Sequence, residues 1–165
     1  MIKNIVLVGG GHSHAIVLKL FAIYPLLGVN LILITPDKYT PYSGMLPGYI
    51  AGFYNYTQCL MDLEKLCRFA GAQLYFDQVI GLDLKNNQLF CNQQSVIDFD
   101  LLSIDIGSTP EKLSVSGAVE YAIAAKPVAQ FLEHWHKLRE NVVINSQKTL
   151  NIGIVGGGAG GVELA

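Results

Sequence analysis

The sequence predicts an α/β fold with a parallel sheet and a small antiparallel β-meander. Two observations lead to this prediction. The runs Ile5–Val8 and Val29–Thr35 are continuously apolar and rich in β-branched residues, as expected for parallel strands that are buried on both faces. Clusters of glycine follow the first of these runs and a later one, Leu150–Val155. A glycine-rich turn that leaves a strand and opens a helix is typical of β-α-β units.

The first predicted unit is a strand, a helix and a second strand. The apolar stretch Ala15–Tyr24 contains no helix breaker and stops at Pro25, so it predicts a mostly buried helix. The second strand, Val29–Thr35, ends at Pro36. Together these elements form a β-α-β unit of about 30 residues, the usual size.

The next region is predicted to be a structured loop followed by a helix. Asp37–Gly52 is rich in tyrosine and proline, and a long aromatic loop inside a compact domain is usually functional. Thr57–Ala70 predicts a helix with Leu60, Leu63, Leu66 and Cys67 on one face.

The remaining elements follow from shorter patterns. Alternating runs predict an antiparallel meander with strands at Gln73–Phe76, Val79–Asp83 and Gln88–Cys91. Apolar runs predict buried strands at Leu101–Ile106 and Leu150–Val155, and a helix is predicted from Pro127 to Glu140.

Composition excludes several classes of protein. The chain has 165 residues, of which 51% are hydrophobic and 15% charged, which fits one globular domain, or one domain and a fragment, and excludes disordered and fibrous classes. The net charge of −2, without blocks of either sign, disfavours a nucleic-acid partner. Three widely spaced cysteines favour a reducing, cytoplasmic location. The apolar run at the N-terminus is too short for a signal peptide or a membrane span.

The two glycine clusters predict dinucleotide binding. A pyrophosphate needs backbone N–H groups at the start of a helix, and glycines let the backbone approach it. Gly156, Gly158 and Gly161 satisfy Gly-x-Gly-x-x-Gly directly after a predicted strand. The first cluster begins with Gly9 and Gly11 and departs from this pattern at its third glycine.

His14 stands where the third glycine of the first cluster belongs. That glycine normally allows close packing of helix and strand, so the histidine implies either a displaced helix or a side chain turned towards the ligand. The acidic residue expected at the end of the second strand is also shifted, because Thr35 holds that position and Asp37 lies two residues further on. Asp37 is a candidate for binding ribose hydroxyls, and the alternative is that it caps the turn after Pro36.

Other chemistry is less well supported. The His-x-His pairs at 12/14 and 134/136 have no nearby carboxylate or cysteine to complete a metal site, and residues two apart on a helix point to different faces. Cys59 and Cys67 are better explained as small apolar residues than as a redox pair. Ser13 and Ser43 lack the context of a nucleophilic serine. The sequence therefore predicts no catalytic side chain and no metal ligand.

In the order of its parts the chain resembles the pyridine nucleotide-disulfide oxidoreductase superfamily of flavoproteins with two dinucleotide-binding domains, which includes NADH dehydrogenases. The resemblance covers the whole chain and rests on the glycine loop Gly9–His14, the strand-exit motif Leu101–Pro110 and the second glycine loop Gly156–Gly161. It implies a Rossmann-like FAD/NAD(P)-binding fold. The redox pair Cys-x-x-x-x-Cys of true disulfide reductases is absent from the first helix, which excludes dithiol chemistry there.

The resemblance implies a role for each residue that matches the family's motifs. Gly9, Gly11, His12, Ser13 and His14 would hold the FAD pyrophosphate; Thr35, Pro36 and Asp37 would border the adenosine ribose, and Val79 the adenine; Pro41, Ser43, Gly44 and Met45 would lie against the isoalloxazine ring; Gly107 and Ser108 would pass under the flavin-side phosphates; Gly156, Gly158, Gly161 and Glu163 would bind NAD(P)H.

The closest resemblance is to the flavoprotein domain fused to the N-terminus of selenide, water dikinase, through Gly9–His14, Thr40–Gly48 and Ser103–Ser108. It implies an FAD-binding domain at 1–115, a connecting segment at 116–149 and the start of a truncated NAD(P)H-binding domain at 150–165. The expected function is that of an N-terminal fragment of an FAD-dependent NAD(P)H oxidoreductase, inactive alone, whose parent reduces a quinone or another small electron acceptor. The alternative is a degenerate dinucleotide-binding module that regulates or scaffolds the fused kinase. The oligomeric state is left open.

Overall fold

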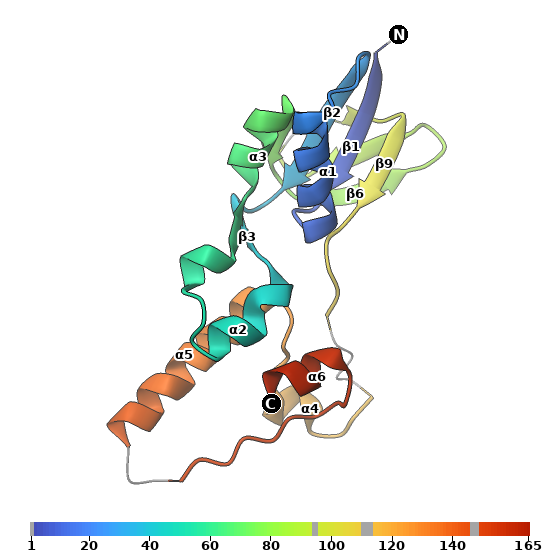
Figure 1. The fold of residues 1–165 in the computed structure, drawn as a ribbon. Helices are drawn as coiled ribbons and strands as arrows, with labels where there is room; N and C mark the ends of the chain where they lie inside the picture. The colour runs from blue at the N-terminus through green and yellow to red at the C-terminus, as the bar shows by residue number, and fades with distance from the viewer. Residues whose placement is uncertain (1, 94–95, 110–113, 146–148) are drawn as a thin grey trace. The chain divides into compact units, whose positions relative to one another are not determined.

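The computed structural model describes residues 2–93, 96–109, 114–145 and 149–165, and its chain divides into two compact units (Figure 1). The first unit consists of Met1–Tyr42 and Leu60–Gly107, and the second of Ser43–Cys59 and Ser108–Ala165. Pro110, the last residue of the strand-exit motif, lies outside the described residues.

A four-stranded parallel sheet forms the centre of the first unit. Its strands are β1 (Lys3–Val8), β2 (Val29–Thr35), β5 (Gln73–Phe76) and β9 (Leu101–Ile104), in the order β5-β2-β1-β9. In the middle of β1, Val6 pairs with Ile32 of β2 and Leu102 of β9. The α/β class and the first two strands are as predicted.

The two faces of this sheet are covered by different layers. Successive side chains of a strand point to opposite faces, so Val6 and Val8 join a core cluster with Leu89 and Phe99 of the antiparallel region. Leu7, on the other face, packs with residues of the helices α1 (His12–Ile23) and α3 (Leu63–Ala70). Figure 1 shows α1 and β6 on the two sides of the sheet. The burial of both faces explains the continuous apolar runs in the sequence.

Helix α1 begins three residues earlier than predicted, because Gly11 in the glycine cluster is its N-cap. Helix α3 is much shorter than the predicted helix Thr57–Ala70, which was wrong in its first half. Asp62 caps α3 by accepting a hydrogen bond from the Lys65 N–H at 2.9 Å. Cys59 therefore lies outside the helix that contains Cys67.

Short strands form in the predicted loop Asp37–Gly52 and near the start of the predicted helix Thr57–Ala70. Strand β3 (Tyr39–Pro41) pairs antiparallel with β4 (Leu60–Asp62). This pairing between distant segments holds Leu60–Asp62 in an extended form, which the helical spacing of its leucines did not predict.

The antiparallel sheet contains β6 (Val79–Asp83), β7 (Gln88–Cys91) and β8 (Ile97–Asp98). Its first predicted strand, Gln73–Phe76, instead pairs in parallel with β2 as β5, so that part of the meander prediction was wrong. Helix α3 precedes β5 and supplies the crossover that parallel pairing requires. Strand β9 is an edge strand that ends at Ile104, with Leu101 and Ile104 more than half exposed, rather than a buried strand that continues to Ile106.

The second unit is built from short helices around one longer helix. It contains η1 (Ser43–Met45), α2 (Leu46–Ile50), η2 (Tyr56–Cys59), α4 (Ala118–Tyr121), α5 (Val128–Ile144) and α6 (Ala159–Leu164). The predicted helix at Pro127–Glu140 is present as α5, which continues to Ile144, and α4 was not predicted. The predicted strand Leu150–Val155 is wrong, because no strand in the described part of the chain pairs with this extended segment.

Among the residues that the structure describes, no helix is long and apolar enough to cross a bilayer.

Candidate functional site

The candidate site of the first unit is the edge of the parallel sheet at which all four strands end. Gly9, Thr35, Asp77 and Asp105 lie at or just beyond the ends of β1, β2, β5 and β9. The chain leaves β1 for β2 on one side, while β9 lies on the other side of β1. The edge between β1 and β9 is therefore a topological switch point, where open α/β sheets bind their ligands.

The turn between β1 and α1 is tight enough to require its glycines. Gly9 has a φ of +94°, and its N–H donates to the Ile34 carbonyl at 2.8 Å. A Cβ on Gly9 would collide with the Asp105 backbone. A Cβ on Gly10 would lie 2.8 Å from the Thr40 hydroxyl oxygen and still closer to Leu63. Neither Gly9 nor Gly10 therefore has room for a side chain.

A carboxylate of the chain itself lies at the start of α1. Oδ2 of Asp105 accepts hydrogen bonds from the backbone N–H of Ser13 at 3.0 Å and of His14 at 3.3 Å. These N–H groups are among those predicted to hold a pyrophosphate. Asp105 belongs to the strand-exit motif Leu101–Pro110 but is not among the residues that the sequence predicts for the site. An aspartate directly after a strand that ends at this edge is the signal that could have identified it.

The His14 ring is buried, with 1% of the residue exposed. Nδ1 lies 2.7 Å from the Gly9 carbonyl oxygen, and Nε2 lies 2.9 Å from the Ser103 hydroxyl oxygen. Because a carbonyl only accepts, Nδ1 donates the proton there, and in the neutral ring Nε2 accepts from Ser103. The ring bridges the glycine loop and β9, so the part of His14 that faces the start of α1 is its backbone N–H.

The end of β2 carries the residues predicted to border a ribose. Thr35 is buried, and Pro36 and Asp37 are exposed. The Thr35 hydroxyl and the backbone of Asp37 lie within 3.4 Å of each other. These hydrogen bonds of the turn use the Asp37 backbone, and the exposed carboxylate makes neither of them.

The predicted flavin loop is divided between the two units. Pro41 ends β3 in the first unit, where the neighbouring Tyr42 ring lies 5.8 Å from the His12 ring, centroid to centroid. Ser43, Gly44 and Met45 form η1 in the second unit.

Val79, the adenine candidate, and the strand-exit residues Gly107 and Ser108 lie at different places in the chain's fold. Val79 begins β6, opposite Cys91, and packs against the core cluster around Val6. Gly107 ends the first unit with a φ of +76° and has open space where a Cβ would be, and Ser108 begins the second unit.

The second glycine cluster opens a helix, as predicted, within the second unit. Gly156 has a φ of +110°, and Gly158 is the N-cap of α6. A Cβ on Gly161 would collide with the Gly156 carbonyl, so the third glycine allows α6 to pack closely on the turn that precedes it. Glu163 is exposed on α6.

The thiols are buried and are kept in their neutral form. Burial raises the pKa of Cys67 to about 11, and it also raises the pKa of Cys59 and of Cys91. Cys59 and Cys67 belong to different units. Within the described ranges, no group of three or more His, Cys, Asp or Glu side chains is placed to hold a metal ion.

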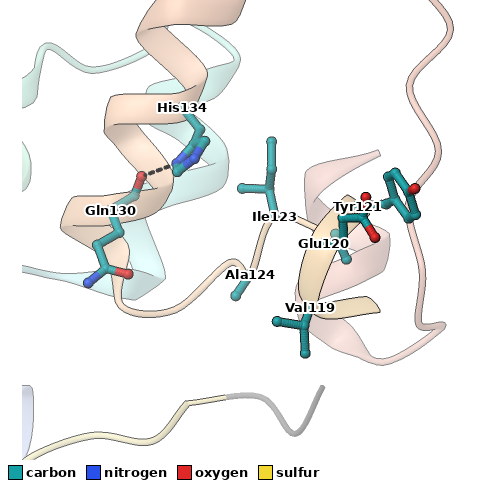
Figure 2. A pocket seen from close by; sticks show the side chains of 8 residues that line it. Val119, Glu120, Tyr121, Ile123, Ala124, Gln130 and His134 are labelled. Atoms are coloured by element: carbon teal, nitrogen blue, oxygen red, sulfur yellow. Dashed lines mark hydrogen bonds between the residues drawn. The ribbon is translucent and has the colours of Figure 1, made fainter. Parts of the chain in front are cut away.

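A cavity of about 340 Å³ lies in the second unit, lined by side chains of α4, α5 and the segment between them (Figure 2). His134 borders it, with Nδ1 hydrogen-bonded to the Gln130 carbonyl of its own helix at 2.8 Å. None of the sequence-predicted cofactor residues lines this cavity. Its lining residues are Val119, Glu120, Tyr121, Ala122, Ile123, Ala124, Gln130 and His134.

The chain is similar in fold to several proteins of known structure. It matches NDH2 from Plasmodium falciparum in complex with RYL-552 at a TM-score of 0.76 and 18% identity, over 99% of this chain and 36% of that one. It matches the sulfide:quinone oxidoreductase of the hyperthermophilic bacterium Aquifex aeolicus at 0.69 and 21%, over 87% and 33%. The water-forming NADH oxidase from Lactobacillus brevis bound to NADH matches at 0.68 and 18%, over 98% and 36%.

These matches establish the fold class. The parallel sheet with its small antiparallel sheet corresponds to FAD/NAD-binding Rossmann-like domains. The chain spans about a third of the length of the solved structures that it matches. No protein-family model matches it, and no curated protein matches it in sequence.

Proposed function

We propose that this chain is the FAD-binding part of an oxidoreductase that accepts hydride from NAD(P)H. The observation that carries the proposal is the glycine turn at the switch point between β1 and β9, which presents the start of α1 at the ends of the parallel strands. The similarity in fold to structures described as NDH2 in complex with NADH and as an NADH oxidase supports it.

The residues present fit a dinucleotide. Gly9 and Gly11, whose own N–H groups bond to the Ile34 and Asp105 carbonyls, would let the pyrophosphate approach the turn. The backbone N–H groups of His12, Ser13 and His14 would bind it, and Asp37 would bind the ribose. FAD, when bound, supplies the acceptor for hydride. The chain's own part is to bind and orient the cofactor and to exclude water from it. We propose that Val79, Pro41–Met45 and Gly107–Ser108 complete the FAD site, and that Gly156, Gly158, Gly161 and Glu163 bind NAD(P)H.

The finer parts of the proposal rest on the sequence. We propose the divisions 1–115, 116–149 and 150–165, a cytoplasmic location, a small electron acceptor such as a quinone, and a parent fused to selenide, water dikinase. The buried thiols support the location, and one similar structure is described as a sulfide:quinone oxidoreductase. The fusion is supported by the motif runs Gly9–His14, Thr40–Gly48 and Ser103–Ser108.

A second candidate function is a dinucleotide-binding module without redox turnover. The contact of Asp105 with the Ser13 and His14 N–H groups favours it, because N–H groups that already donate to a carboxylate bind a phosphate less tightly.

The test is the visible absorption of the chain after incubation with FAD and gel filtration. We expect a retained flavin band. Ser13→Glu should abolish it, because the added carboxylate would repel the pyrophosphate while acidic residues in a first turn favour the helix itself. Ser13→Ala is the matched control and should retain flavin. Absence of flavin from the wild-type chain and from Ser13→Ala would contradict FAD binding.

A further inference from the structure

We propose that Asp105 is an internal anion that competes with the dinucleotide pyrophosphate for the start of α1 and so sets the affinity of the site. This inference rests on the proposed function. The Asp105 carboxylate accepts hydrogen bonds from the N–H groups of Ser13 and His14. A Cβ on Gly11 would collide with the same carboxylate. Two anions cannot share these donors, so a pyrophosphate binds only when the Asp105 side chain leaves.

The contact differs from an ordinary helix cap. Helix α3 is capped by its own N-cap residue, Asp62. Helix α1 has Gly11 at its N-cap, no side-chain cap from that residue and no acidic residue in its first turn. Its carboxylate comes from a residue 92 positions away from Ser13 in the sequence, at the end of a different strand.

Release of the carboxylate requires only rotation of one side chain. The Asp105 backbone is held in place, because its N–H donates to the Val8 carbonyl at 2.8 Å and its carbonyl accepts from the Gly11 N–H at 3.2 Å. The side chain of Asp105 is half-buried and takes no part in these two backbone hydrogen bonds. The loop can therefore exchange the internal anion for an external one without changing the course of the chain.

Asp100 offers a matched control. It directly precedes β9 as Asp105 directly follows it, and its carboxylate accepts from the Asn4 N–H at 2.8 Å and pairs with Lys3. Asp100→Asn thus removes one negative charge, as Asp105→Asn does, but at the opposite end of β9. Asp105→Asn keeps the shape and one carbonyl acceptor, so that the fold is retained.

The experiment titrates the wild-type chain and both variants with inorganic pyrophosphate and, separately, with FAD. The amide resonances of Ser13 and His14 report the first titration, and flavin fluorescence reports the second. Asp105→Asn should bind both ligands about tenfold more tightly than the wild type, since it gives up charge-assisted hydrogen bonds to the loop. Asp100→Asn should bind like the wild type.

The outcomes separate the two proposals. Equal or weaker binding of FAD and pyrophosphate by Asp105→Asn, with the wild type binding FAD, would overturn the competition and leave the FAD site. Tighter pyrophosphate binding at the two amides without FAD binding by any variant would support the competition and overturn the FAD site. If neither ligand binds any of the three proteins, both proposals fail.

Discussion

His14 and Ser103 join the glycine loop to the edge strand of the sheet. Nε2 of the buried ring lies 2.9 Å from the Ser103 hydroxyl, and Nδ1 lies 2.7 Å from the Gly9 carbonyl. The residue that replaces the third glycine of the motif is thus a structural bridge within the first unit. A glycine there would leave the space between loop and strand unfilled.

The first prediction concerns this bridge. His14→Gly, which restores the motif's third glycine, should lower the free energy of unfolding by about 3 kcal/mol, because it removes a buried side chain and places a glycine in a helix. Ser103→Ala should cost about 1 kcal/mol through the lost hydrogen bond. Urea unfolding measures both changes.

The double variant is the control for the bridge. If the two side chains act together, Ser103→Ala should cost much less in the His14→Gly background than in the wild type. Full additivity of the two costs would show that the pair is not coupled.

The second prediction compares two glycines with positive φ. Gly9 has a φ of +94° and lies against the Asp105 backbone, whereas Gly28 has a φ of +75° and open space around it. Gly28→Ala should cost about 1 kcal/mol from its backbone conformation alone. Gly9→Ala should cost at least about 3 kcal/mol, because the strand exit must also move. Similar costs in thermal unfolding would contradict the close packing at Gly9.

The third prediction concerns the second glycine cluster. The Cβ of Gly161→Ala would strike the Gly156 carbonyl, whereas that of Gly160→Ala would meet open space. Gly161→Ala should therefore displace α6 from its turn and shift the amide resonances of residues 156–165. Gly160→Ala should leave the turn unchanged and favour the helix by about 1 kcal/mol. Equal shifts from both changes would disprove the close approach.

The fourth prediction concerns the Cys67 thiol, which is 2% exposed and has a pKa raised by burial from 9.0 to about 11. The thiolate is the reactive form, so iodoacetamide should modify Cys67 slowly at about pH 8 in the folded chain and rapidly in urea. Mass spectrometry of the labelled peptide measures the two rates. Rapid labelling of the folded chain would contradict its burial.

The raised pKa of Cys67 also predicts how the free energy of unfolding changes with pH. A pKa that is higher in the folded than in the unfolded chain gives stability that is complete below the unfolded value of 9.0 and is lost as the pH rises towards about 11. Cys67→Ala should make the fall in unfolding free energy over this window shallower. An unchanged slope would show that Cys67 does not contribute to it.

Strands β1 and β2 could be predicted from the sequence because their signal is local. Both are buried on two faces, so their apolar runs are continuous, and β2 coincides with the predicted Val29–Thr35. The segment Leu60–Asp62 was predicted as helix, and it forms a strand because Tyr39–Pro41 pairs with it. The alternation in Gln73–Phe76 indicates a strand, but only the position of β2 decides that it pairs in parallel.

The candidate site divides in the same way. The glycine turns at Gly9 and Gly156 are determined by the sequence itself, because positive φ angles and close backbone approach are local demands that glycine alone meets without strain. Only the tertiary structure decides that Asp105 reaches the N–H groups of Ser13 and His14. That contact exists because β9 lies beside β1 in the sheet, and strand order depends on packing between residues far apart in the chain, which no local pattern records.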